Sequence, residues 1–530
     1  MKSKTIHLEK ANTLSNFITE EERFNIVSLK ITGFIGNSDF DDVLDEMCSS
    51  CGDYDDDDNY TLWYELSPAL RHLDMGEATY VDGDALPDFG HRTLLETIIL
   101  PQGIKSTCWG FETELAKSDS LQTLVLPEGI KTVSGFFHCP KLTDLVLPED
   151  VETIEEDAFY GCESITEIRI PASVKSLKGN SFAGCSIEAY DVDERNPYYT
   201  VVDGVVYTKD RKTLVAFPSA YPKKHFVVPS TTLVIGDYAF CASRLEHVEL
   251  PDGLTAIMKR AFESCLVRDV NIPDTVATIG TGLFSYCMDL EHVGISAKLT
   301  EIPWCVFEWC PKLKELVVPS NVRKLHYSSI TWGRGIVRLV LQDGMEEIVG
   351  GGDMFVGKST LREVIIPKTL KKLQGGVFNY GPHLDSFCLD PDNPYFCILG
   401  EALCSKDGKT LISIPGYHRE TYSIPEGVEV VAECAFKGVQ SLRTIYVPSS
   451  VEEVGHNAFR EDNLETVVME GCVPPKMTGK AEMYEKKVLY VPHEAVSAYE
   501  KAPGWNCFIV KGCDGRLPKR KNPTFLSEEE

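Results

Sequence analysis

The chain has 530 residues, 43% of them hydrophobic and 25% charged, a composition that suits either several ordinary domains or one long repeat array. Its formal net charge of −28 argues against nucleic acid and anionic membranes as partners, because both select for concentrated lysine and arginine. The sequence contains no run of about 20 apolar residues, the length that would predict a membrane-spanning helix, and residues 1–10 lack the apolar core of a signal peptide. A basic or neutral partner fits this charge best.

Residues 1–93 predict an irregular N-terminal cap made of degenerate repeats. Stretches starting at Ile26 and Leu70 have the apolar spacing of strands, and a helix is expected between them around residues 41–47. Cys48 and Cys51 form a C-x-x-C pair without a second pair, so a zinc or redox role is kept only as an alternative.

An acidic run at residues 53–60 is the densest cluster of charge in the sequence. It lacks the glycine and the distal glutamate of an EF-hand loop. We therefore predict a solvated loop, with calcium binding or contact with a basic partner as the alternatives.

From residue 94 the sequence repeats a unit of about 23 residues of the form L-x-x-L-x-L-P…A-F-x-x-C, over 94–186 and again over 245–383. Units begin at Leu121, Leu142, Ile165, Leu245, Val267, Leu290, Leu313, Ile336, Leu361, Leu442 and Leu464. The proline ends a strand, because it cannot donate to a β-ladder. The phenylalanines recur at Phe159, Phe182, Phe262, Phe284, Phe307, Phe378 and Phe459, and the cysteines at Cys162, Cys185, Cys265, Cys287 and Cys310.

Residues at one phase of such a repeat stack along an axis, and no single unit buries its own apolar side chains. The predicted fold is a right-handed leucine-rich-repeat solenoid. Short parallel strands line its concave face, and turns and few helices make up the rest. The recurring cysteines suit this core as buried reduced thiols.

Two segments, 187–244 and 384–441, interrupt the repeat with the same insertion. Asn196-Pro197-Tyr198 matches Asn393-Pro394-Tyr395 at an offset of 197, and the matching sequence continues through Gly204 and Gly400. Asn-Pro is a turn signal, and β-branched and aromatic residues follow it, so each insertion predicts a hairpin. The last repeats and a C-terminal cap occupy 442–512, with a short helix over 493–501, and 513–530 are predicted to be a disordered tail.

Units such as Leu142-x-x-Leu-x-Leu-Pro…Ala158-Phe159-x-x-Cys162 resemble the BspA-type leucine-rich repeats of bacterial surface proteins. The Asn-Pro-Tyr insertions and the ending around Ala502-Pro503-Gly504-Trp505 are similar to the same family. The resemblance implies a non-enzymatic protein that engages a host or neighbouring-cell protein from the cell surface. The missing export signal departs from the family, so a cytoplasmic location is the alternative.

The solvent-facing positions of the predicted strands are the expected binding surface. The fifth position of each unit changes from β-branched to polar and back to β-branched along the array, and the third position carries further charged residues. The predicted partner-binding residues are Arg169, Asp191, His247, Glu249, Asp269, Asn271 and His292. His247, Asp269 and His292 also form a weak candidate for a divalent metal site, although side chains on a flat sheet rarely converge on one ion.

The sequence contains no recognisable catalytic or cofactor-binding motif, so no enzyme activity and no cofactor are predicted. Binding of a protein through the strand surface is the first hypothesis. A carbohydrate-binding accessory is the alternative, and its aromatic candidates are Trp304, Trp309, Trp332, Tyr327 and Tyr446. A purely structural spacer remains a third possibility.

Overall fold

The computed structural model describes residues 2–48, 52–54, 60–62, 69–87, 94–107, 118–330, 335–349, 360–375, 377–378, 384–416, 420–460, 463–479 and 487–513. These residues form a parallel β-solenoid with few helices, as predicted. The chain divides into two compact units, Met1–Val267 and Arg268–Glu530. Cys51, Trp332, most of the acidic run and residues 514–530 lie outside the described ranges, so the predictions made for them stay predictions.

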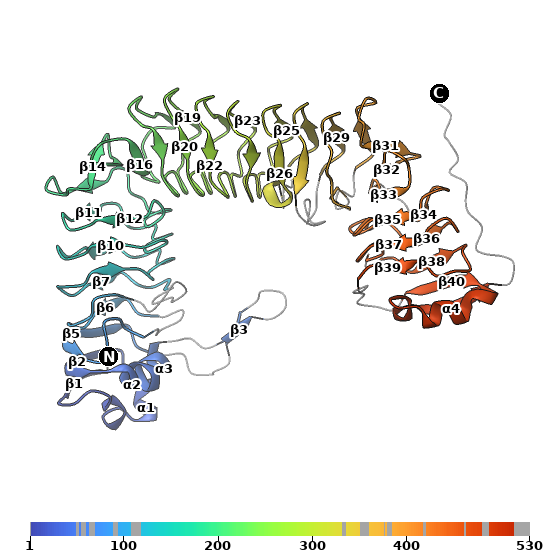
Figure 1. The fold of residues 1–530 in the computed structure, drawn as a ribbon. Coiled ribbons are helices and arrows are strands. Elements are labelled where there is room, and N and C mark those ends of the chain that lie inside the picture. The colour runs from blue at the N-terminus through green and yellow to red at the C-terminus, as the bar shows by residue number, and fades with distance from the viewer. Residues whose placement is uncertain are drawn as a thin grey trace, which may run out of the picture. The chain divides into compact units, whose positions relative to one another are not determined.

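The first unit carries one row of strands that comes from the L-x-x-L-x-L segments (Figure 1). One parallel sheet contains β1 (Ser3–Leu8), β2 (Ser28–Ile35), β5 (His72–Tyr80), β6 (Thr97–Ile99), β7 (Thr123–Val125) and β9 (Asp144–Val146). The row continues as two further pairs, β11 (Arg169–Ile170) with β13 (Asp191–Val192) and β17 (His225–Val227) with β19 (His247–Glu249). We call the solvent-facing side of this row the strand face.

A second row of strands follows the proline turn of each unit, and the sequence predicted only the hairpin strands of the insertions in it. In the first unit it contains β8 (Thr132–Val133), β10 (Thr153–Ile154), β12 (Ser176–Leu177), β14 (Tyr199–Val202), β15 (Val205–Thr208), β16 (Thr213–Ala216), β18 (Val234–Ile235) and β20 (Ala256–Ile257). Most of these strands are two residues long, too short for a period-two pattern to mark them.

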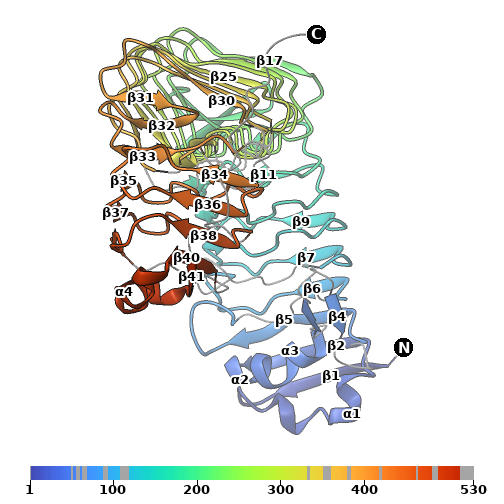
Figure 2. The same ribbon diagram turned by 90° about the vertical axis from the view of Figure 1, so that its right-hand side faces the viewer.

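The N-terminal cap places its helices beside β1 and β2 (Figures 1 and 2). They are η1 (Leu14–Asn16), α1 (Glu20–Arg23), α2 (Asn37–Asp39), the π-helical turn η2 (Phe40–Leu44) and α3 (Asp45–Cys48), and the hairpin β3 (Gly52–Tyr54) with β4 (Tyr60–Leu62) follows. The helix expected around 41–47 is therefore confirmed. The buried carboxylate of Asp39 accepts hydrogen bonds from the backbone N–H groups of Asn12, Leu14 and Gly36, which ties the first loop to the cap.

The second unit repeats this arrangement. Its first row contains β21 (Asp269–Asn271), β23 (His292–Gly294), β25 (Glu315–Val318), β27 (Arg338–Leu341), β29 (Glu363–Ile366), β30 (Ser386–Leu389), β34 (Thr421–Ser423), β36 (Thr444–Val447), β38 (Thr466–Met469), β40 (Val488–Pro492) and β41 (Ile509–Cys513). Its second row contains β22 (Thr278–Ile279), β24 (Glu301–Ile302), β26 (Lys324–His326), β28 (Glu347–Val349), β31 (Phe396–Leu399), β32 (Ala402–Ser405), β33 (Thr410–Ser413), β35 (Val430–Val431), β37 (Glu453–Val454) and β39 (Lys476–Met477).

Helical turns in the second unit are η3 (Tyr327–Ile330) and, at its C-terminal end, η4 (His493–Ala495), α4 (Val496–Lys501) and η5 (Trp505–Cys507). The helix predicted over 493–501 is confirmed. In the part of the chain that the structure describes, no helix is long and apolar enough to span a membrane.

Phenylalanine rings at one phase stack between neighbouring turns and fill the core. The ring centroids of Phe159 and Phe182 are 5.3 Å apart, and those of Phe240 and Phe262 are 4.9 Å apart with the planes nearly parallel. These separations are close to the spacing of neighbouring strands, about 4.8 Å, so each ring lies over the next. The predicted cysteine column is also buried, as Cys162, Cys185, Cys265, Cys287 and Cys310.

Each insertion is a three-stranded meander that joins the second row. In the first, β14, β15 and β16 are antiparallel and β16 pairs parallel with β18; in the second, β31, β32, β33 and β35 repeat the pattern. The two predicted hairpins are confirmed, each with one additional strand.

A buried asparagine anchors each insertion. The Asn196 amide donates to the carbonyls of Pro171 and Val174 and accepts from the N–H groups of Tyr198 and Tyr199. Asn393 makes the same four hydrogen bonds one insertion later, with Pro367, Leu370, Tyr395 and Phe396. A buried polar group needs this complete set of partners, so the Asn-Pro-Tyr signature is explained by structure.

A glycine marks a close backbone contact across each insertion. A Cβ atom on Gly179 would lie 2.4 Å from the carbonyl oxygen of Asp237, and one on Gly375 would lie 2.0 Å from that of Glu433. In both places the contacting residue comes 58 positions later, more than twice the repeat step. The turn before each insertion therefore packs directly against the turn after it.

Candidate functional site

The strand face of the first unit contains an open pocket of about 580 Å³, which we call the face pocket. Its floor comes from residues of and beside β9, β11 and β13, and its lining residues are Leu145, Val146, Leu147, Glu149, Glu167, Ile168, Arg169, Pro171, Ala189, Tyr190 and Asp191. β9 ends one sheet and β11 begins another, so the pocket lies where the ladder of hydrogen bonds is interrupted. Its volume falls within the range of small-ligand sites, about 300–1,000 Å³.

Val146 lines the pocket with 79% of its surface exposed. The register of the sheet places Ile99, Val125 and Val146 next to one another on three successive strands. Val125 is also exposed, so an apolar stripe leads across the strands to the pocket. Of these three side chains Val125 and Val146 are exposed and Ile99 is half-buried, and the most exposed of them, Val146, lines the pocket.

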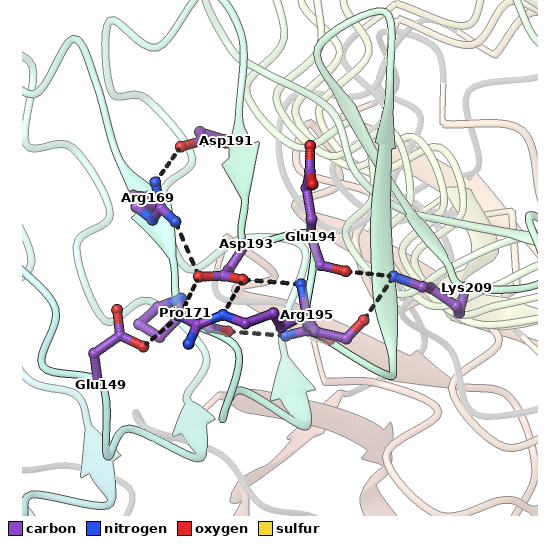
Figure 3. A network of polar contacts seen from close by, with 9 residues as sticks. Glu149, Arg169, Pro171, Asp191, Asp193, Glu194, Arg195 and Lys209 are labelled. Carbon is purple, nitrogen blue, oxygen red and sulfur yellow. Dashed lines mark hydrogen bonds and ion pairs between the residues drawn. The ribbon is translucent and has the colours of Figure 1, made fainter.

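A network of ion pairs lies beside the pocket (Figure 3) and shares Glu149, Arg169 and Asp191 with its lining. Asp193 lies at its centre with only 3% of its side chain exposed. Arg169 Nη2 donates to Asp193 Oδ2 at 2.9 Å, and Arg195 binds the same carboxylate through Nε at 2.9 Å and Nη2 at 2.7 Å. Arg169 also lies 3.6 Å from Asp191, and Arg195 lies 3.5 Å from Glu149. We call these five residues the arginine–aspartate network.

The pKa of Asp193 is well below its ordinary value of 3.8. Hydrogen bonds from the Arg195 side chain are the largest cause, followed by the Arg195 backbone N–H and the Arg169 guanidinium. The two-pronged contact of Arg195 is the geometry in which a guanidinium binds a carboxylate most strongly. Asp193 therefore stays ionised and holds both arginines in place.

The network joins the insertion to the strand face. Arg195 directly precedes the anchoring Asn196. Lys209, in the turn between β15 and β16, donates to the carbonyls of Glu194 and Asn196 at 3.3 and 2.7 Å (Figure 3). The start of the first insertion is consequently fixed from both sides, and Glu149, Arg169 and Asp191 of the pocket are held by residues next to it.

The predicted partner-binding residues fall into three groups. Arg169 and Asp191 are neighbours in the register of β11 and β13 and form part of the pocket. His247 and Glu249 are exposed on β19, where Glu249 pairs with His225 Nε2 at 2.8 Å. Asp269, Asn271 and His292 belong to the second unit, and Asp269 pairs with His292 Nδ1 at 2.8 Å.

The structure gives no support for a metal site at His247, Asp269 and His292. Among the residues that the structure describes, no group of three or more histidine, cysteine, aspartate or glutamate side chains is close enough to hold an ion. The Asp269–His292 contact is accounted for as a cross-strand pair.

The buried cysteines are poor nucleophiles. Burial raises the pKa of Cys185 and of Cys310 to about 12 and that of Cys265 to about 11. The Cys162, Cys185 and Cys310 thiols each donate to the carbonyl of a phenylalanine one turn away. Only a thiolate attacks efficiently, so these side chains act as part of the core.

The aromatic candidates for carbohydrate binding are not brought together as a group. Tyr446 is buried, which contradicts its expected place on an exposed platform. Trp304 is exposed and donates from Nε1 to His326 at 2.7 Å. Trp309 stacks on Tyr286, a partner that the sequence did not suggest, while Trp332 and the Tyr327 side chain lie outside what the structure describes.

Residues 131–198, 215–334 and 418–474 match the BspA type Leucine rich repeat region, in six copies. The chain carries BspA-type leucine-rich repeats. The predicted family is thereby confirmed, and so is the leucine-rich-repeat fold. A search of the curated proteins finds no match.

Solved structures similar to this chain include a leucine-rich repeat protein from Eubacterium ventriosum, with 19% identity and a TM-score of 0.40; the match covers 79% of this chain and 84% of that one. A leucine rich cell surface protein from Faecalibacterium prausnitzii has 19% identity and a TM-score of 0.36, covering 73% and 83%. A leucine-rich repeat protein from Bacteroides ovatus has 18% identity and a TM-score of 0.34, covering 69% and 88%. At these values the three structures give no information about the function of this chain.

Sequence reasoning missed Glu149, Asp193 and Arg195. The sequence held a usable signal. Arg169 lies opposite Asp191, and the residue two positions after Asp191 is the diagonal neighbour of Arg169. Asp193 occupies that diagonal position. Reasoning from the repeat also missed His225 and Val227 on β17, since their unit lacks the Leu-x-x-Leu landmark.

Proposed function

We propose that this protein is a non-enzymatic binding protein that holds a protein partner on the strand face of its first unit, at the face pocket. The single observation that carries the proposal is Val146, a valine that lines the pocket with 79% of its surface exposed, beside ion pairs that centre on the buried carboxylate of Asp193. An exposed apolar patch with a polar rim is typical of an interaction site. The leucine-rich-repeat family supports this reading, since such repeats generally serve as protein-interaction scaffolds.

An extended segment is the shape of partner that suits the surface. The stripe of Ile99, Val125 and Val146 crosses three strands at right angles to the chain, at steps of about 4.8 Å. A segment laid across the strands would place successive side chains on this stripe and reach the pocket at its end. Attachment to a host or neighbouring cell is the setting that the family resemblance implies.

The test is selection of peptides from a displayed library of random 12-residue sequences on the whole protein. We expect enriched peptides to lose binding in a Val146→Glu variant, which puts a charge on the stripe. Val227→Glu is the matched control, because Val227 is also an exposed strand valine of the first unit but lies on β17. Peptides that bind Val146→Glu and the parent protein equally would place the binding site elsewhere.

One observation favours carbohydrate binding as a second candidate. Tyr286 and Trp309 stack with centroids 6.1 Å apart, and Tyr286 is 42% exposed. Both have positive φ, 61° and 53°, at the position where Gly161 and Gly184 stand in other repeats. Non-glycine residues at this position have positive φ in other repeats as well, so the repeat accounts for the conformation and the exposed ring pair alone supports this candidate. A glycan array should show ligands that a Trp309→Ala variant loses; an array without ligands would remove this candidate.

A further inference from the structure

The face pocket carries an excess of negative charge. Glu149, Glu167 and Asp191 line it, and Arg169 is the one cationic residue among the lining residues. Glu149 and Asp191 have 64% and 65% of their side chains exposed, and Glu167 is exposed as well. The oxygens of these carboxylates are therefore within reach of a ligand.

The two arginines do not make the site a receptor for anions. Arg169 and Arg195 direct their donors at the buried carboxylate of Asp193, which neutralises much of their charge. An incoming anion would have to compete with Asp193 and would meet three further carboxylates at the rim. The charge of the pocket is complementary to a cation.

The floor has the chemistry that the stem of a long cationic side chain needs. Val146 offers exposed apolar surface between the buried side chains of Leu145 and Leu147, and Ala189 adds a small exposed side chain to the lining. Lysine and arginine place their methylene groups on such surface while the charged head stays among polar groups and water.

We propose that the face pocket takes a lysine or arginine side chain of the bound segment, with the stem on Val146 and the head between Glu167 and Asp191. This inference rests on the proposed function and adds the chemical class of the partner: a basic segment whose neighbouring residues are apolar or β-branched. Apolar side chains of that segment lie on Val125 and Ile99, at successive strand steps. The net charge of −28 assists the encounter, because it attracts basic proteins over a longer range.

The test uses the peptides selected from the displayed library. We expect lysine or arginine to be enriched at one position relative to the unselected library. Replacing that residue in the strongest peptide with norleucine, which keeps the stem and removes the charge, should weaken binding about tenfold, equivalent to about 1.4 kcal/mol. Raising the salt concentration from 50 to 500 mM should weaken the parent peptide and leave the norleucine peptide nearly unchanged.

Variants of the protein locate the effect. A Glu167→Gln/Asp191→Asn double variant should bind the parent peptide about tenfold more weakly and the norleucine peptide as before. Glu163→Gln is the control, since Glu163 is an exposed carboxylate in the turn just before Ile165 and does not line the pocket. Both substitutions are on the surface, and a circular dichroism spectrum identical to that of the parent protein confirms that the variant is folded.

The possible outcomes separate the two proposals. Peptides that depend on Val146 but show no preference for lysine or arginine, or that bind the double variant unchanged, overturn the cationic pocket and leave the binding surface. A selection that yields no Val146-dependent peptide overturns both. If the double variant binds the parent peptide more weakly but binds the norleucine peptide as before, the result supports both proposals.

Discussion

The two insertions share one scaffold and present different surfaces. The anchoring asparagine, its lysine partner and the glycine before it occur in both: Asn196, Lys209 and Gly179 in the first unit and Asn393, Lys406 and Gly375 in the second. The residues on the strand face have diverged. Where the first unit has Arg169, Asp191 and Arg195, the corresponding positions in the second are Ile365, Cys388 and Asp392.

This difference separates the residues that the shared fold requires from those that only the first insertion has. Asp390 corresponds to Asp193 and accepts the same backbone hydrogen bond, here from the Asp392 N–H group, but Asp193 alone of the two binds two guanidinium groups. What both copies keep is explained by the fold, and what only the first copy has is explained by the pocket. The first insertion is thus the better place to look for a partner.

The largest effect is expected from loss of the shared asparagine. Asn196→Ala leaves four backbone groups without a partner, and Asn393→Ala does the same in the second unit. Each should lower local stability by about 3 kcal/mol, measured by hydrogen exchange of the insertion amides. Asn463→Ala removes one exposed hydrogen bond and should change little. Effects below about 1 kcal/mol in both variants would refute the shared scaffold.

Alanine at the contact glycines should have the next largest effect. The added Cβ of Gly179→Ala or Gly375→Ala meets backbone that has little freedom to move, so each change should cost about 1–3 kcal/mol. The melting temperatures of the variants and of their controls are measured by thermal unfolding monitored by circular dichroism. Gly253→Ala and Gly471→Ala are matched controls, because their nearest atoms would lie 3.7 and 3.6 Å away. Equal melting shifts in variants and controls would speak against the close contact.

Acid should distinguish the two insertions. Because the folded-state pKa of Asp193 is depressed, the stability it contributes is complete above about pH 4, its unfolded value, and is lost as the pH falls through the folded value. Pepsin cleavage near the first insertion should therefore rise, relative to the second in the same sample, as the pH falls from 4 to 2. Asp193→Asn should abolish the pH dependence of this ratio. A ratio that is flat in the parent protein would contradict the prediction.

The smallest effect concerns Cys388, which stands where the first unit has Asp191. Partial burial and a hydrogen bond to Glu363 raise its pKa. Glu363→Gln removes the negative partner, and alkylation by iodoacetamide at pH 8 should become about two- to threefold faster. Cys185 should stay unmodified until the protein unfolds, because it is buried. An unchanged or slower rate at Cys388 would show that Glu363 does not control it.

Much of this molecule was predictable because its repeat is regular. Columns such as Phe159–Phe182 and Cys162–Cys185 mark the core, and the Asn-Pro-Tyr sequence marks both insertions. The second row of strands was not predictable, since a pair such as Thr153–Ile154 is too short to show a period.

The candidate site was predictable only in part. Arg169 and Asp191 follow from the strand positions, whereas Asp193 and Arg195 come after the strand and act through diagonal contacts. The interruption between β9 and β11 depends on how consecutive turns pack, which a single repeat unit does not reveal. Tyr446 was assigned to an exposed platform because strand direction alone does not report what covers a side chain.

The contact at Gly179 also bears on how the first unit unfolds. In a simple solenoid each repeat couples only to its nearest neighbours, so the array can fray one repeat at a time from either end. Contact of the turn at Gly179 with Asp237 and Tyr238 adds a coupling between turns that are not consecutive. The same coupling recurs at Gly375 and Glu433. Each insertion should therefore act as a cooperative block, in which the turns on both sides exchange their amide hydrogens together.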